Sequence, residues 1–216
     1  MAVGEVDLWL ATYERAAQRV DVERMLDPAE RIRAAAIGDG AARSRYVTTR
    51  ALLRALLAHY ARVASDALQI ELDAHGKPVL RVPAAPQFNL SHSGDVLLLA
   101  IAAAPTVGID YEAPRQIVDP LRVARRVFSS DEQAALLQAA DESIALRDVL
   151  FVKLWTRKES LLKAFGTGFA GGAREFDVRA DEVGEFRVHS LTLPIPGVAA
   201  IALPQTARLR AAYVLS

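Results

Sequence analysis

Three acidic side chains and one lysine form the most reactive group of residues that the sequence predicts. Asp110 and Glu112 occupy positions i and i+2 of residues 107–112, a predicted short strand, so both carboxylates should face the same side. Glu159 and Lys163 lie one turn apart on a predicted helix. Like-charged carboxylates that approach each other need a cation or a proton between them. Three carboxylate ligands suit Mg²⁺, which keeps waters and substrate phosphate oxygens as further ligands.

Each of these patterns also has an ordinary structural explanation. A Glu and a Lys at i,i+4 form a common surface pair that stabilises a helix by about 0.3–0.5 kcal/mol. An Asp-x-Glu pair on a strand is weak evidence when taken alone. Residues 91–93, Ser-His-Ser, can be a capped turn with a satisfied histidine, and residues 76–78, Gly-Lys-Pro, are common in plain hairpins. A Ser–His nucleophile pair is not expected, because sequence neighbours rarely present the required geometry.

The helix that carries Glu159 and Lys163 is predicted to span residues 143–165. Gly166 and Gly168 should end it, as glycines do just past a helix C-terminus, and a glycine-rich segment continues to residue 172. The helical period is set by Leu150, Phe151, Leu154, Trp155, Leu161, Leu162 and Phe165.

The remaining elements predict an α+β protein with two halves, residues 1–104 and 105–216. Each half runs strand, helices, strands, which suggests a structural duplication. Further helices are predicted at 28–36, 41–63, 120–127 and 130–139. Strands are predicted at 6–10, 68–72, 79–82, 88–94, 96–102, 107–112, 175–179, 185–192, 198–203 and 209–214.

Composition excludes several classes of protein. The chain has 216 residues, of which 52% are hydrophobic, so a sizeable core is possible. Its net charge of zero argues against a nucleic-acid partner held by phosphate neutralisation. There is no cysteine, and no apolar run approaches the ~18 residues of a membrane span. We therefore expect a cytoplasmic protein with no membrane partner. Only four of the 26 basic residues are lysines, namely Lys77, Lys153, Lys158 and Lys163.

In series, the motifs resemble those of the 4′-phosphopantetheinyl transferases, and specifically of the larger surfactin-type class. The first signature is Gly-Lys-Pro at 76–78 followed by Phe-Asn-Leu-Ser-His-Ser at 88–93. The second is Val-Gly-Ile-Asp-Tyr-Glu at 107–112, and the third is Trp-Thr-Arg-Lys-Glu-Ser-Leu-Leu-Lys at 155–163. The resemblance implies a monomer of two similar α+β halves related by pseudo-twofold symmetry, with the active site between them.

The resemblance also implies a reaction. Such enzymes transfer the 4′-phosphopantetheine arm of coenzyme A to a serine hydroxyl of an apo acyl-carrier or peptidyl-carrier protein. The reaction depends on Mg²⁺, with Mn²⁺ as an alternative ion, and releases adenosine 3′,5′-bisphosphate. The implied activity is that of a holo-[acyl-carrier-protein] synthase serving fatty-acid, polyketide or nonribosomal-peptide carriers.

Site residues follow from the resemblance position by position. Asp110, Glu112 and Glu159 are expected to hold the metal ion, and Lys163 to contact the pyrophosphate. Glu159, directly or through a water, is the expected base for the serine proton. Arg33 is the favoured early basic contact of the coenzyme. The full set of expected coenzyme A contacts is Arg31, Arg33, Arg45, Lys77, Pro78, Asn89, Ser91, His92 and Lys163.

Two functions from other classes remain open alternatives. A metal-dependent nuclease also uses acidic pairs followed by a Glu and a Lys, but zero net charge with no basic tract disfavours a DNA-cleaving surface. A non-catalytic module that binds coenzyme A or a carrier is the second alternative. Three carboxylates at the site of an anionic ligand argue against it, because a pure binder of an anion has no need of them.

Overall fold

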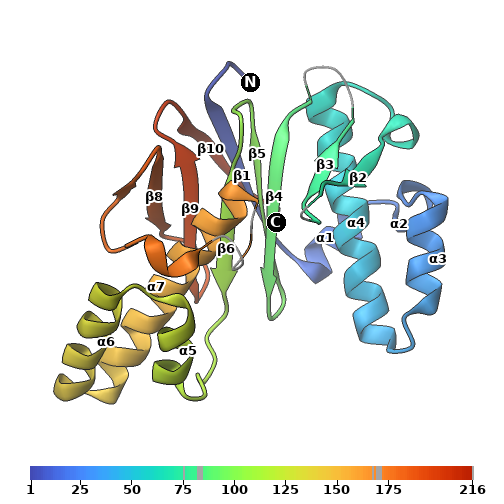
Figure 1. Ribbon diagram of the computed structural model, residues 1–216. Helices are drawn as coiled ribbons and strands as arrows, with labels where there is room; N and C mark the ends of the chain where they lie inside the picture. The colour runs from blue at the N-terminus through green and yellow to red at the C-terminus, as the bar shows by residue number, and fades with distance from the viewer. Residues whose placement is uncertain (75, 82–84, 167, 169–171, 216) are drawn as a thin grey trace.

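The computed structural model describes residues 1–74, 76–81, 85–166, 168 and 172–215 (Figure 1). The first half contains β1 (Glu5–Thr12), α1 (Tyr13–Arg19), α2 (Val22–Met25), α3 (Pro28–Ala36), α4 (Gly40–Ala61), β2 (Ile70–Leu72), β3 (Pro78–Leu80), β4 (Gln87–Ser93) and β5 (Val96–Ala102). The second half contains β6 (Gly108–Glu112), α5 (Pro120–Val127), α6 (Ser130–Glu142), α7 (Ile144–Phe165), β7 (Glu182–Val183), β8 (Phe186–Leu191), β9 (Val198–Pro204) and β10 (Arg208–Val214).

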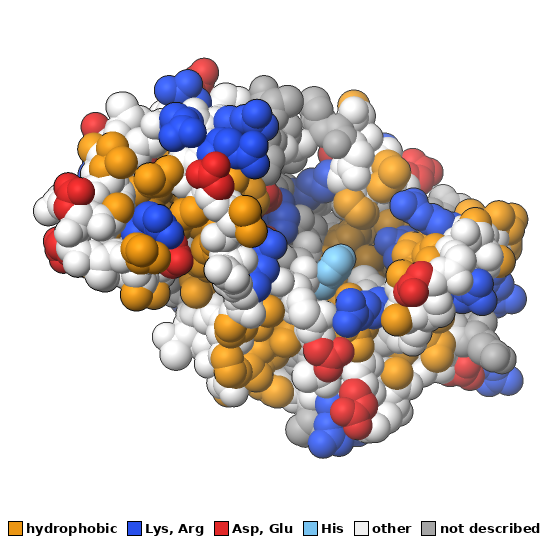
Figure 2. Space-filling view, turned by 90° about the horizontal axis from the view of Figure 1, so that it is seen from below, with side chains coloured by type: hydrophobic (Ala, Val, Ile, Leu, Met, Phe, Trp, Pro, Cys, Tyr) orange, Lys and Arg blue, Asp and Glu red, His pale blue; other side chains and the backbone are white. Residues whose placement is uncertain are grey.

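Two four-stranded sheets lie face to face at the centre of the molecule. Their strand orders are β10-β1-β5-β4 and β6-β9-β8-β7, and β2 and β3 form a separate hairpin. Helices cover the outer faces, with α1 to α4 on one side and α5 to α7 on the other (Figure 1). Seen from below, these helices form two lobes with a hollow between them (Figure 2). The predicted α+β class with two similar halves is confirmed.

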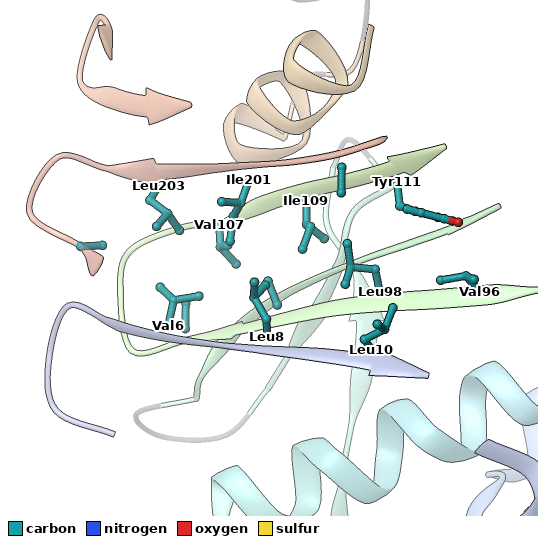
Figure 3. Packing of buried hydrophobic residues seen from close by; sticks show 14 residues of the cluster. Val6, Leu8, Leu10, Val96, Leu98, Val107, Ile109, Tyr111, Ile201 and Leu203 are labelled. Atoms are coloured by element: carbon teal, nitrogen blue, oxygen red, sulfur yellow. The ribbon is translucent and has the colours of Figure 1, made fainter. Parts of the chain in front are cut away.

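The core between the sheets is built from alternate residues of facing strands. Side chains such as Val6, Leu8 and Leu98 of the first sheet meet Ile109 and Ile201 of the second (Figure 3). Alternate residues of a strand point to one face, so each sheet presents one apolar row to its partner. All seven residues of β5 are buried, which accounts for its continuous apolar sequence.

Helix ends follow the local chemistry of the sequence. Asp27 and Glu30 form a capping box at α3, and Ser129 and Glu132 form another at α6. Gly166 ends α7 in the left-handed conformation with φ of 77°, which glycine adopts without a Cβ clash. The helices predicted at 28–36 and 120–127 are confirmed at both ends.

One predicted strand is wrong, and several of the described elements were not predicted. Glu175 is the last residue of a short 3₁₀ turn (Ala173–Glu175), and residues 176–179 are in neither a helix nor a strand. The Val178 N–H donates to Glu132 Oε1 at 2.8 Å and its carbonyl accepts from Arg157 Nε at 2.5 Å, so side chains satisfy the groups that a strand ladder would use. The described elements that were not predicted include α1, α2, β7 and two short 3₁₀ helices, Ser65–Ala67 and Ala173–Glu175.

Some predicted segments fall partly outside the described residues. These are residue 82 of the 79–82 strand and residues 167 and 169–171 of the glycine-rich segment.

The last strand crosses from the second half into the first sheet. β10 runs parallel to β1, pairing Glu5 with Arg208 and Leu10 with Val214. The predicted division at residues 104 and 105 falls between β5 and β6, and β10 is the one described strand that joins the sheet of the other half. The rings of Trp9 and Tyr213 stack across this pairing with centroids 4.4 Å apart.

A buried carboxylate anchors this crossing. Asp7 is fully buried and accepts hydrogen bonds from Tyr60 Oη at 2.5 Å and from the guanidinium of Arg210, whose Nε lies 2.8 Å away. Burial alone would raise the pKa of Asp7, but the bonds from Arg210 and Tyr60 outweigh it and hold the pKa below its usual value. The carboxylate therefore joins β1, α4 and β10.

The lowered pKa of Asp7 makes this anchor sensitive to acid. A carboxyl group with a depressed pKa contributes stability that is present above about pH 4 and is lost as pH falls through the folded-state pKa. We expect Asp7→Asn to be less stable than the parent at pH 7 and to lose less stability below pH 4. Denaturant unfolding at pH 7, 4 and 3 measures both effects, with exposed Asp66→Asn as control. Identical pH profiles for the Asp7→Asn variant and the parent would contradict the prediction.

Candidate active site

The site begins with a direct contact between the backbones of α7 and β6. A Cβ atom at Gly108 would lie 1.9 Å from the Ser160 carbonyl oxygen and 2.4 Å from the Ala164 nitrogen. Only glycine allows this approach, because any side chain would push the helix off the strand. The contact places Glu159 and Lys163, which directly precede Ser160 and Ala164 on α7, beside the carboxylates of β6.

A cavity of about 270 Å³ lies where these elements meet. Figure 2 shows Lys and Arg side chains around the hollow between the two lobes. The cavity's lining residues come from β4, β6 and α7, and they are Leu90, Ser91, His92, Asp110, Tyr111, Glu112, Trp155, Glu159 and Lys163. The structure therefore brings the predicted acidic trio, Lys163, Ser91 and His92 into one cavity between the two halves.

Asp110 is held by two partners and retains one unpartnered oxygen. Its Oδ1 accepts hydrogen bonds from Lys163 Nζ at 2.7 Å and from Ser91 Oγ at 2.9 Å. Its Oδ2 is buried and has no hydrogen-bond partner among the described residues. Burying an acceptor without a partner costs free energy of folding, so Asp110 Oδ2 is well placed to bind a cation.

Glu112 is oriented from three sides. Its Oε1 accepts hydrogen bonds from Trp155 Nε1 and from Arg115, each at 3.2 Å, and its Oε2 accepts one from Ser93 Oγ at 3.2 Å. Arg115 and Ser93 were not predicted as site residues, and Trp155 was expected only as an apolar helix position. The alternation of polar residues along β4 is the signal that could have indicated Ser93.

Electrostatic crowding marks Glu159. The pKa of Glu159 is raised to about 7, chiefly by burial; the Lys163 ammonium opposes this rise, and the carboxylates of Asp110 and Glu112 add to it. A divalent cation between the three carboxylates would relieve this repulsion, and an all-oxygen donor set suits Mg²⁺. Among the described residues no three acidic or histidine side chains are already converged on a common metal position. The fit of these three carboxylates to Mg²⁺ therefore rests on the Asp110 oxygen that has no partner and on the repulsion between the carboxylates.

The Lys77 side chain extends from the first half to residues of the second half. Its Nζ donates to the Lys163 carbonyl at 2.9 Å and to Thr106 Oγ1 and the Val107 carbonyl at 3.3 Å each, and burial lowers its pKa. It thereby ties the β2–β3 hairpin to the last turn of α7. A cavity of about 230 Å³ there is lined by Gly76, Lys77, Pro78, Asn89, Leu162, Lys163, Gly166 and Gly168.

The predicted early arginines occupy different positions. Arg45 and His92 line a third cavity of about 540 Å³ together with Tyr13 and Tyr46. Arg33 lies over the Tyr46 ring, 5.7 Å from its centroid. Arg31 instead donates to the Leu26 carbonyl at 3.0 Å and does not line this cavity.

His92 lies where this cavity meets the acidic one. Burial, together with the charges of Lys163 and Arg45, lowers the pKa of His92, which favours the neutral imidazole. It lines both the 270 Å³ and the 540 Å³ cavities. His92 therefore stands between a cavity lined by three carboxylates and a cavity lined by Arg45.

Comparison with known proteins identifies the class. Residues 106–214 match a family model described as the 4′-phosphopantetheinyl transferase superfamily, and residues 14–105 match one described as 4′-phosphopantetheinyl transferase, N-terminal. The chain belongs to the 4′-phosphopantetheinyl transferase superfamily.

Individual relatives agree with this assignment. The chain is 34% identical over 165 residues to 4′-phosphopantetheinyl transferase psf-1 of Bacillus pumilus, which covers 76% of this chain and 66% of that protein. It is 32% identical over 170 residues to 4′-phosphopantetheinyl transferase HetI of a Nostoc species, covering 77% and 70%. It is 28% identical over 137 residues to 4′-phosphopantetheinyl transferase Sfp of Bacillus subtilis, covering 63% and 58%. The chain thus spans less than two thirds of the length of some of these relatives.

The contact at Gly108 yields a stability prediction. Gly108→Ala forces the backbone of α7 away from β6, and overpacking of this kind destabilises proteins by about 1–3 kcal/mol or more. Gly40→Ala is the control, because no atom lies within 4 Å of a Cβ there and alanine favours the first turn of α4. Chemical denaturation should show a large loss for Gly108→Ala and no loss for Gly40→Ala. A Gly108→Ala protein as stable as the parent would contradict the close contact.

Proposed function

We propose that this protein transfers the 4′-phosphopantetheine arm of coenzyme A to a serine of an apo acyl-carrier or peptidyl-carrier protein. The activity is that of a holo-[acyl-carrier-protein] synthase, with adenosine 3′,5′-bisphosphate as the second product. The observation that supports it most is the convergence of Asp110, Glu112, Glu159 and Lys163 on one cavity, with a buried oxygen of Asp110 lacking a partner. Membership of the superfamily and the relatives' names agree with this proposal.

The acidic trio is the proposed magnesium site. Asp110, Glu112 and Glu159 would hold the ion, and Mn²⁺ could replace it. When bound, the ion neutralises charge on the pyrophosphate of the coenzyme during attack. The Lys163 ammonium, now paired with Asp110 at 2.7 Å, faces the same cavity and stabilises charge on the leaving phosphate.

Glu159 is the proposed general base. The serine oxygen of the carrier attacks the β-phosphorus, and the bond from this phosphorus to the bridging oxygen breaks. The serine proton passes to the Glu159 carboxylate, directly or through a water, and the bridging oxygen leaves with the adenosine 3′,5′-bisphosphate. Proton removal by a positioned carboxylate contributes about 10²–10⁴ in rate.

The larger cavity is the proposed site for the nucleotide end of the coenzyme. Arg45 lines it and Arg33 lies over the Tyr46 ring, so guanidinium groups and aromatic faces are both present for a nucleotide. The neutral imidazole of His92 then lies between this end and the acidic trio. Lys77 contributes through the hairpin that it ties to α7, with Pro78 and Asn89 lining the adjoining cavity.

The carrier is proposed to dock across α5. Ile117, Val118 and Val123 line an apolar cavity of about 240 Å³ that also touches Glu112 and Trp155, so it adjoins the acidic trio. Exposed Arg115 also lines this cavity, and α5 carries the exposed arginines Arg122, Arg125 and Arg126. Exposed arginines on the helix that contributes to an apolar cavity favour an acidic partner with an apolar contact residue.

The proposed enzyme is a monomer whose two halves, residues 1–104 and 105–216, enclose the site. Their sheets already bury each other's apolar faces, so no second copy is needed to cover them. In the described part of the chain no helix is long and apolar enough to cross a membrane.

Transfer to a carrier tests the proposal directly. We expect coenzyme A, Mg²⁺ and an apo-carrier to give a carrier heavier by one phosphopantetheine in mass spectrometry, and EDTA to stop the transfer until Mg²⁺ is restored. Glu159→Gln should fold and lose at least about 10²-fold in kcat, since it removes a base and a metal ligand. Exposed Glu185→Gln is the matched control.

Other outcomes identify the alternatives. Transfer that survives excess EDTA would overturn the magnesium site. Cleavage of DNA without carrier modification would favour a nuclease, and coenzyme binding with no transfer to any carrier would favour a binding module.

Charge reversal on α5 tests the docking surface. Arg122 and Arg126 lie at i and i+4 of this helix and are exposed. Arg122→Glu/Arg126→Glu should raise the KM for an acidic carrier about tenfold at low salt and leave the KM for coenzyme A unchanged, because rim charges act on encounter with the partner. Arg187→Glu on β8 serves as control. A double variant with an unchanged KM for the carrier would place docking elsewhere.

A further inference from the structure

β4 and β6 run beside each other but belong to different sheets. Among the described residues no ladder of backbone hydrogen bonds joins β4 to β6, because β4 pairs with β5 and β6 pairs with β9. The N–H groups of Ile109 and Tyr111 on β6 are nevertheless satisfied from β4. Asn89 Oδ1 accepts the Ile109 N–H at 2.9 Å, and Ser91 Oγ accepts the Tyr111 N–H at 3.1 Å.

The same row of β4 side chains reaches the carboxylates. Ser91 Oγ donates to Asp110 Oδ1 at 2.9 Å, and Ser93 Oγ donates to Glu112 Oε2 at 3.2 Å. Residues 89, 91 and 93 alternate along the strand and so share one face. We call Asn89, Ser91 and Ser93 the seam.

Bridging by side chains has two consequences for the site. Backbone-paired strands lie about 4.8 Å apart, and a bridge through a side chain holds them farther apart. This separation leaves room for the cavity between the halves. The Ser91 proton engages Oδ1 of Asp110, as Lys163 Nζ does, and Oδ2 is left without a partner among the described residues.

We infer that the seam positions Asp110 and Glu112 for the metal ion, an inference that rests on the proposed function. A serine hydroxyl has one proton, and the proton of Ser91 is given to Asp110. Ser91 therefore acts on the coenzyme through Asp110, which differs from the direct phosphate contact expected from the sequence. Hydrogen bonds to ligating carboxylates orient them and raise metal affinity, and their loss typically weakens it 10–100-fold.

Ser93→Ala is the sharpest test, because the Ser93 hydroxyl contacts Glu112 and bridges no β6 backbone group in the described contacts. Electron paramagnetic resonance of free Mn²⁺, titrated into protein with coenzyme A and no carrier, measures metal affinity without turnover. We expect about tenfold weaker Mn²⁺ binding in Ser93→Ala, restored in Ser93→Thr, which keeps the hydroxyl. Ser91→Ala should weaken binding at least as much. Exposed Ser130→Ala, at the start of α6, should not change it.

The outcomes separate the seam from the enzymatic proposal. Unchanged Mn²⁺ affinity in both alanine variants, or equal weakening in Ser93→Thr and Ser93→Ala, would overturn the seam's role, as would a parent protein that binds no Mn²⁺. A parent that transfers no phosphopantetheine, but whose Mn²⁺ affinity falls in Ser93→Ala and returns in Ser93→Thr, would leave the seam intact and remove the proposed function. Normal transfer by the parent with unchanged Mn²⁺ affinity in every variant would support the proposed function and overturn the role of the seam.

Discussion

The contact of α7 with β6 at Gly108 is the constraint on which the site depends. Main chain lies on main chain there, with the Ser160 carbonyl and the Ala164 nitrogen filling the space of an absent side chain. The distance between the two elements is therefore fixed by backbone atoms and not by the choice of a rotamer. Because Glu159 is on the helix and Asp110 is on the strand, this fixed distance also limits how far the two carboxylates can move relative to each other.

Buried charges hold the elements around this contact. Lys158 and Glu132 are both fully buried, with Nζ and Oε2 2.8 Å apart, and Lys158 also donates to the Ala173 carbonyl. Such a pair adds little net stability over an apolar pair, but removing one partner leaves an uncompensated buried charge. Three of the four lysines thus have distinct structural settings: Lys158 joins α6 to α7, Lys77 joins the hairpin to α7, and Lys163 faces the carboxylates.

Local patterns could be predicted from the sequence, and long-range placement could not. The i,i+2 spacing of Asp110 and Glu112 and the i,i+4 spacing of Glu159 and Lys163 fix which side chains share a face, and these four residues meet as expected. No local rule indicates that β4 side chains would satisfy the backbone of β6, or that Lys77 would turn toward carbonyls of α7. The strand expected at 175–179 failed for the same reason, because its hydrogen-bond partners come from distant helices.

The parallel pairing of β10 with β1 also bears on how the chain assembles during synthesis. Asp7 and Arg210 are 203 positions apart, so the first sheet gains its last strand only after nearly every other element exists. Ribosomes add about 5–20 residues per second, which leaves the outer edge of β1 open for roughly 10–40 s. An uncovered strand edge is a template for pairing with another chain. Closing a loop this long is slow because of its entropic cost. Once β10 has paired with β1, the Trp9–Tyr213 stack helps to hold it there, so β1 is synthesised before most other elements but gains its second neighbour last.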